Sequence, residues 1–386
     1  MSKKIIIKRL VFLALSVLFF VFYKNICSAL DVPEVSQEIY NQQLKLSSVS
    51  KLSSYTPDET TKDLENIGIK TSNWQEFLRI NPSKIFNFIF KKIKNNISKP
   101  LKTMCTIVFI VIIYATIKSF NFELDDNVDK VMIVISLLCI CLCLVNPVSG
   151  CIGNISNIIK NIVNFMLCYA PVMSTIMIAS GQPVTATFYQ NLVLFSGQII
   201  NYIFEYFVVP VINILFSLSL ISCLTNTFDL TKIIQYFYKI IKTVLGFVSV
   251  IFTGILTLQN LVAGATDNVG TSAAKFALNS FVPVVGGMLT DAFGTVTGCL
   301  KLLKSSTGVF EILVGMLMFL PSIIECFLWS VSLNISACVS EIFGIEKVTN
   351  MLKSIAKIMS LLISVLVFVA VILIVSSAIV MIMGGK

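Results

Sequence analysis

Long apolar runs separated by short polar stretches make up most of this chain. Several runs reach the roughly 20 residues that a helix needs to cross a bilayer core about 30 Å thick. The pattern predicts membrane-spanning helices near 103–120, 130–149, 155–180, 236–262, 307–331 and 355–383. Residues 188–224 would extend about 55 Å as a helix, too long for one crossing. Because Pro210 interrupts that run, it predicts either two short spans or one span with a bent interfacial arm.

The N-terminal hundred residues divide into two regions. Residues 1–29 have a basic start, an apolar core over 10–22 and small residues at 27–29, which predicts a secretory signal peptide. An uncleaved anchor helix is the alternative. Residues 30–100 are polar, and we expect an extracytoplasmic helical region there. Residues 101–386 then form a polytopic, permease-like membrane domain, and the expected fold class is all-α with six to eight spans.

Residues 84–97 carry apolar and basic positions on opposite faces of a helix. Apolar residues recur at helical spacing, and the opposite face carries Lys84, Asn87, Lys91, Lys94 and Asn95. This pattern predicts a basic amphipathic helix. It would either lie on an anionic lipid surface or pack its apolar stripe against protein.

The segment 264–299 is unusually polar and rich in glycine for its apolar surroundings. It holds six of the 18 glycines in the chain. Unsatisfied backbone groups and charges are costly in lipid, so this segment should face protein or water. We expect a broken or re-entrant segment near 273–299 that lines a polar cavity. The alternative is an ordinary loop with an amphipathic helix outside the bilayer.

Charged residues inside apolar runs are the remaining functional candidates, because charge within a membrane usually marks a pathway or an ion pair. We expect Lys160 and Glu311 to lie at the membrane interface, where long side chains reach water. Glu205 and Asp291 are the strongest candidates for the interior. The predicted cavity or pathway residues are Glu205, Lys275, Pro283, Gly286, Gly287 and Asp291.

Composition agrees with this membrane class and disfavours catalysis. Hydrophobic residues make up 56% of the chain and charged residues 13%, against about 25% charged in soluble proteins. The chain has no histidine, no C-x-x-C pair and no Walker-type phosphate loop, so we predict no enzyme, no catalytic residue, no cofactor and no metal site. The net charge of +9 comes from lysines and arginines beside apolar segments, which indicates membrane anchoring and not nucleic-acid binding.

Two parts of the chain share a proline-centred pattern. "PVMSTIMIASG" follows Pro171 and "PVVGGMLTDAFG" follows Pro283, and each begins with Pro-Val and ends in small residues. Paired interrupted segments are typical of secondary transporters, although Pro-Val also recurs by chance in a valine-rich chain. A secondary transporter of a small solute, coupled through Asp291 or Glu205, is therefore the alternative function.

Three stretches resemble a known family. "KFALNSFVPVVGGMLTDAFGTV", the overlapping "GATDNVGTSAAKF" and the earlier "SGQPVTATFYQNLVLF" are similar to the stage III sporulation protein AE family of endospore-forming bacteria. The resemblance implies a permease-like, export-apparatus-like subunit of an assembly made in the mother cell and set in the membrane around the forespore. It also implies partners, namely the other stage III sporulation A-operon membrane proteins and a forespore-made protein, which together form a channel or secretion-like conduit. No catalytic residue carries over from the family.

Overall fold

The structure, a computed structural model, describes residues 40, 43–44, 49, 52, 55–69, 82–120, 126–224, 231–281 and 286–382. The predicted signal peptide at 1–29 lies outside these residues. Within them the regular elements are all helices. They are α3 (Asp58–Ile67), α5 (Pro82–Asn96), α6 (Ser98–Phe120), α7 (Asp126–Ala179), α8 (Pro183–Ile203), the π-helical turn η2 (Phe204–Val208), α9 (Val209–Leu224), α10 (Thr231–Phe281), α11 (Gly286–Ile342) and α12 (Glu346–Ile382).

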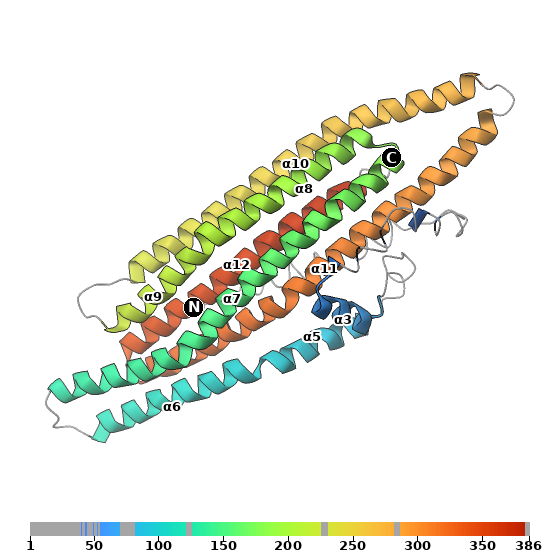
Figure 1. Ribbon diagram of the computed structural model, residues 1–386. Helices are drawn as coiled ribbons and strands as arrows, with labels where there is room; N and C mark the ends of the chain where they lie inside the picture. Colours follow the sequence, from blue (N-terminus) through green and yellow to red (C-terminus); the bar gives the residue numbers. More distant parts are fainter. Residues whose placement is uncertain are drawn as a thin grey trace.

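The helices form one elongated bundle whose members run nearly along a common axis (Figure 1). Helix α12 lies in the middle and is the most buried of the long helices, with residues such as Leu352, Leu361 and Val365 fully enclosed. It packs mainly against α11 and α10. Helix α10 lies at an edge of the bundle, and much of its surface is exposed.

Among the described residues, six helices are long and apolar enough to cross a membrane, as expected for a polytopic all-α membrane protein. They are Ser83–Ser119, Val131–Ala179, Pro183–Ser222, Ile233–Gly270, Gly294–Ile342 and Glu346–Ala378. This number agrees with the predicted six to eight spans.

The separate spans predicted at 130–149 and 155–180 are wrong, because both belong to the continuous helix α7. Its 54 residues pass through Pro147 and Pro171 without a break. A proline removes one backbone hydrogen bond, and the flanking turns and packed neighbours hold the helix together. At 1.5 Å per residue α7 is about 81 Å long, more than twice the thickness of the hydrocarbon core.

Residues 188–224 follow the single-span alternative. Helix α8, η2 and α9 succeed one another without a loop, and η2 lies immediately before Pro210. Pro210 has no N–H to donate to the carbonyl of Tyr206, and a wider π-helical turn accommodates this missing bond.

The glycine-rich segment 264–299 is a helical hairpin for most of its length. Helix α10 continues to Phe281 and α11 begins at Gly286. Residues 282–285, which include Pro283, lie outside the described residues, so the predicted break near Pro283 stays a prediction. The ends of α10 and α11 that flank it project beyond the other helices at one end of the bundle (Figure 1).

The N-terminal region packs against the start of α11. The hydroxyls of Tyr40 and Ser306 lie 3.2 Å apart, and Gln43 Nε2 donates to the carbonyl of Val296 at 3.4 Å. Lys92 of α5 joins Asp63 of α3 at 2.8 Å. These contacts tie α3 and α5 to the membrane domain.

The predicted helix over 84–97 is confirmed as α5, and its apolar residues divide between two environments. Phe88 is buried against the bundle, whereas Phe86 and Phe90 are 70% and 62% exposed. Backbone hydrogen bonds continue through Ile97 into α6, so α5 extends the axis of α6. The protein-packing alternative therefore holds for one face, and lipid binding by the exposed face stays a prediction.

Candidate functional site

Buried polar side chains follow one face of α11. Lys304, Thr307, Glu311, Ser322 and Glu325 recur at spacings that return to the same side of a helix, and all but the half-buried Glu325 are buried. The stripe from Lys304 to Glu325 covers about 32 Å, close to the thickness of a hydrocarbon core. Lys304 is 1% exposed and Glu311 is fully buried. Ionisable groups buried at membrane depth are functional candidates.

Glu311 lies where four helices meet. Its carboxylate accepts a hydrogen bond from the Ser377 hydroxyl of α12. The hydroxyls of Tyr169 on α7 and Tyr189 on α8 interact electrostatically with the same carboxylate. Both hydroxyls and Glu311 Oε1 are buried, and none of the three meets strict hydrogen-bond geometry within the described part of the chain, although Tyr169 faces the carboxylate closely enough to interact with it. Oxygen atoms in this state are ready to bind a proton, a water molecule or a small cation.

Lys304 and Asp267 meet the start of α8 from two other helices. Lys304 Nζ donates to Gln182 Oε1 at 2.9 Å. The Asp267 carboxylate accepts hydrogen bonds from the backbone N–H groups of Val184 and Thr185 at 3.1 and 2.8 Å, and from the Thr185 hydroxyl at 2.6 Å. Asp267 of α10 therefore caps α8 from outside that helix, where a negative charge complements the helix dipole.

Two glycines of α11 let it approach α12 closely. A Cβ atom at Gly308 would lie 2.6 Å from Met381 Cγ, and one at Gly315 would lie 2.9 Å from both methyl carbons of Leu373. Gly308 and Gly315 flank Glu311 on the same helix. The close contact brings Ser377 within hydrogen-bonding distance of the carboxylate, so the glycines help to define the site.

The expectation that Glu311 lies at the membrane interface is wrong. Hydropathy alone does not tell which face of an apolar helix turns inward. The seven-residue spacing between Lys304 and Glu311, two turns on one face, is the sequence signal that could have identified the buried stripe.

Glu205, a predicted interior residue, lies at the surface of η2. Its carboxylate pairs with Lys160 Nζ of α7 at 2.9 Å, and the two side chains are 42% and 43% exposed. Lys160, which we expected at an interface, is thus partly exposed and paired. The structure therefore joins Glu205 to Lys160, and a role for Glu205 in a cavity or pathway stays a prediction.

The other predicted cavity residues lie in or beside that hairpin. Lys275 belongs to α10, Gly286 and Gly287 begin α11, and Asp291 follows in the first turns of α11. The side chains of Lys275 and Asp291 and the whole of Pro283 lie outside the described set. Their role in a water-accessible cavity stays a prediction.

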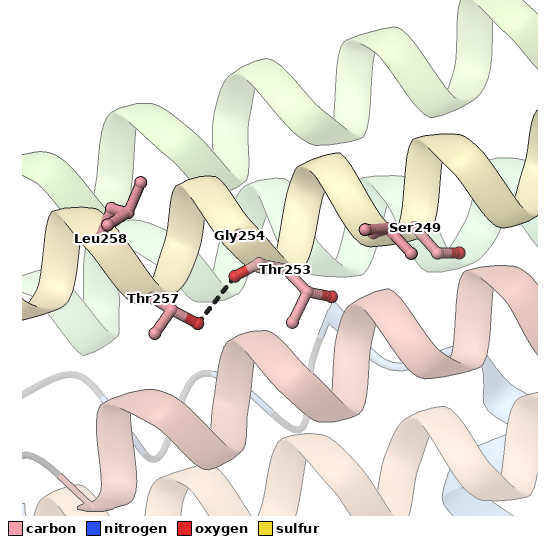
Figure 2. A pocket seen from close by; sticks show the side chains of 6 residues that line it. Ser249, Thr253, Gly254, Thr257 and Leu258 are labelled. Atoms are coloured by element: carbon pink, nitrogen blue, oxygen red, sulfur yellow. Dashed lines mark hydrogen bonds between the residues drawn. The ribbon is translucent and has the colours of Figure 1, made fainter.

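A shallow hollow on α10 offers little chemistry. It has a volume of about 500 Å³ and is lined by Ser249, Val250, Thr253, Gly254, Thr257 and Leu258 (Figure 2). The hydroxyls of Ser249 and Thr257 donate to their own helix backbone, to Leu245 and Thr253. The lining contains no charged group, so the Glu311 stripe is the better candidate site.

Metal and thiol chemistry find little support in the described residues. They contain no cluster of three or more Cys, Asp or Glu side chains that could hold a metal ion. The nine cysteines described there are free, and Cys151 lies 3.7 Å from Glu325 Oε1. A buried thiol beside a carboxylate is poorly disposed to form the reactive thiolate.

Comparison with known proteins agrees with this membrane architecture. A family model described as stage III sporulation protein AE matches residues 69–384. The protein named stage III sporulation protein AE in Bacillus subtilis (strain 168) is 27% identical over 248 residues. That match covers 64% of this chain and 60% of the relative's length. No solved structure matches the chain.

Proposed function

This chain belongs to the stage III sporulation protein AE family, and we propose that it is a permease-like membrane subunit of a channel or secretion-like complex between mother cell and forespore. The observation that carries the proposal is the family match over residues 69–384. The complex would be needed for endospore formation. The family is described by a stage of sporulation and not by a catalysed reaction, which supports a non-enzymatic role.

The architecture supports a subunit that works within the membrane. Six helices can span a bilayer, and their interior holds a charged stripe from Lys304 to Glu325. The proposed location is the mother-cell-derived membrane around the forespore. The proposed partners are the other stage III sporulation A-operon membrane proteins and, through them, a forespore-made protein.

Deletion and co-purification in the sporulating host test this function. Loss of the gene should lower the number of heat-resistant spores, and re-expression of the chain should restore it. The tagged chain, extracted in mild detergent during sporulation, should bring down the other A-operon membrane proteins. Normal spore numbers after deletion, or purification without those partners, would contradict the proposal.

A secondary transporter of a small solute is the alternative, favoured by the unpartnered buried oxygen atoms around Glu311. Such atoms suit a coupling proton or cation. Purified chain in sealed vesicles should then accumulate solute when an ion gradient is applied, and the Glu311→Gln variant should not. A conduit subunit alone should show no coupled uptake.

A further inference from the structure

The outward face of α7 is polar over nearly the length of a hydrocarbon core. Its exposed large hydrophobic side chains stop at Val145 and resume at Ile178. Between them the exposed residues are Asn146, Ser149, Gly150, Gly153, Asn154, Asn157, Asn161, Asn164, Pro171 and Thr175. The polar stretch from Asn146 to Asn164 is about 27 Å long, against about 30 Å for the core. Hydrocarbon chains offer no hydrogen-bond donor or acceptor to the exposed asparagine side chains.

A second polar stripe runs beside the first on α8, η2 and α9. Its exposed residues are Thr187, Asn191, Gln198, Glu205, Asn213 and Ser217. The ion pair between Lys160 and Glu205 joins the two stripes near their middle. Since both partners are about two-fifths exposed, this pair needs water around it. Aromatic residues including Tyr202 and Tyr206, whose rings lie 4.9 Å apart, border the second stripe.

Helix α10 carries the opposite surface at the same level along the bundle. Asp267 of α10 binds the start of α8, where the Ser174 hydroxyl of α7 donates to the carbonyl of Ala186. These contacts place Asp267 and Ser174 at one level, and α7 and α10 run in the same direction (Figure 1). Val250 lies 17 residues before Asp267, and Asn157 lies 17 residues before Ser174, so Val250 and Asn157 are at the same level along the bundle. There the large exposed side chains of α10 are apolar, and they include Phe247, Val250, Ile251 and Leu258. The exposed hydroxyl of Thr257 among them donates to its own helix backbone.

We propose that the polar face of α7 and α8–α9 lines a water-filled passage for hydrated polar solutes, while the α10 face turns toward lipid. A single slab of bilayer cannot suit both surfaces, because one exposes asparagine and an ion pair where the other exposes phenylalanine and valine. Further protein chains would close the passage, since one face alone makes a wall and not a pore. This inference deepens the proposed function, and the role given to the passage in sporulation rests on that function.

Thiol labelling of matched positions tests the wall directly. Asn157→Cys and Asn161→Cys probe the polar face, and Val250→Cys and Leu258→Cys probe α10 near the same level. Each full-length variant is expressed during sporulation with its native cysteines. Opened membranes are treated with a charged methanethiosulfonate, and peptide mass spectrometry measures the labelling rate of the added cysteine. Because the hydrated thiolate attacks the sulfur of the reagent and displaces methanesulfinate, the polar face should react at least about tenfold faster than α10.

Equal rates would overturn the proposal in either direction. Fast labelling at all four positions would place this level outside the hydrocarbon, and slow labelling at all four would mean that packed protein covers the polar face. Spore counts of the deletion strain separate this inference from the proposed function. If the polar face labels fast but the deletion strain sporulates normally, the water-filled passage is supported and the proposed role in sporulation is contradicted.

Discussion

At the scale of single residues, substitution of Glu311 tests whether its buried charge serves function or stabilises the fold. If Glu311 is lost, the Ser377 hydroxyl can donate to the carbonyl of Leu373, which lies 2.9 Å away. A buried carboxylate is costly to keep charged, so an apolar residue of similar volume need not destabilise the bundle. We therefore expect Glu311→Leu to keep the membrane level and the melting temperature in detergent while lowering the number of heat-resistant spores. Glu341→Gln, at the exposed end of the same helix where Glu341 pairs with Lys353, is the matched surface control. A fall in both melting temperature and membrane level for Glu311→Leu would show a structural role instead.

Gly315 should respond to added bulk in the opposite way from Gly254. A side chain at Gly315 meets Leu373 of α12, whereas nothing lies within 4 Å of a Cβ at Gly254. Gly315→Leu should destabilise the bundle by about 1–3 kcal/mol through overpacking. Gly254→Leu should be neutral or slightly stabilising, because leucine favours helix over glycine. Thermal unfolding in detergent measures both. The Leu373→Ala change should partly rescue Gly315→Leu, and an equal loss at both glycines would contradict the close contact between α11 and α12.

The residue types could be read from the sequence, but their environments could not. Glu205 and Glu311 both interrupt apolar runs, and hydropathy treats them alike. Glu311 is enclosed because α7 and α12 pack on its face of α11 and Tyr189 of α8 reaches the carboxylate. Glu205 lies beside Lys160 on the outside. Which face turns inward depends on the arrangement of the helices, and local sequence does not specify it.

At the scale of elements, α5 presents three faces that should respond to different substitutions. Phe88 packs inward, Phe86 and Phe90 form an exposed apolar stripe, and Lys84, Lys91 and Lys94 are exposed beside it. Replacing these three lysines by glutamate in the full-length chain should reduce the anionic lipid that co-purifies with it. Each lysine near such a surface contributes on the order of 1 kcal/mol.

Lys92 is the matched control for α5, because it pairs with Asp63 and Glu59 of α3. Lys92→Ala should loosen α3, seen as faster proteolysis near residues 58–67, and leave the bound lipid unchanged. If reversing the charge of the other three lysines changed proteolysis but not bound lipid, α5 would serve only to pack against protein.

Element types were more predictable than element limits. The 3.6-residue periodicity of 84–97 predicted α5, and the apolar runs predicted the long helices. The break expected between 149 and 155 is absent from α7, which also continues through Pro147 and Pro171. Proline in a long packed helix costs one hydrogen bond, and neighbouring helices stabilise the rest. Apolar runs alone therefore set the class of each element but not where it ends.

At the scale of the whole molecule, the bundle has two chemically distinct ends. The helix ends next to residues 121–125, 225–230 and 343–345 lie at one end, and the tip of the α10–α11 hairpin lies at the other (Figure 1). Lysines gather in the sequence near the first end, at Lys118, Lys130, Lys232, Lys239, Lys242, Lys347 and Lys353. Within ten residues of the two turns at 180–182 and 282–285, Lys275 is the only lysine or arginine.

This asymmetry predicts the orientation of the chain. Lysines close to the ends of membrane helices favour the cytoplasmic side, so the helix ends next to residues 121–125, 225–230 and 343–345 should be cytoplasmic, and the hairpin tip should share the outer side with residues 40–69. The contacts of Tyr40 with Ser306 and of Gln43 with Val296 require the same side for both. The basic stretch 84–102 runs against the rule, which holds statistically and is overridden when a signal peptide directs the preceding region outward.

A fluorescent protein inserted at 225–230 should fold and fluoresce, and alkaline phosphatase inserted at 282–285 should be active. The reverse pattern would place the N-terminal region in the cytoplasm, and inactive reporters at both sites would be resolved by labelling single added cysteines from each side of sealed membranes.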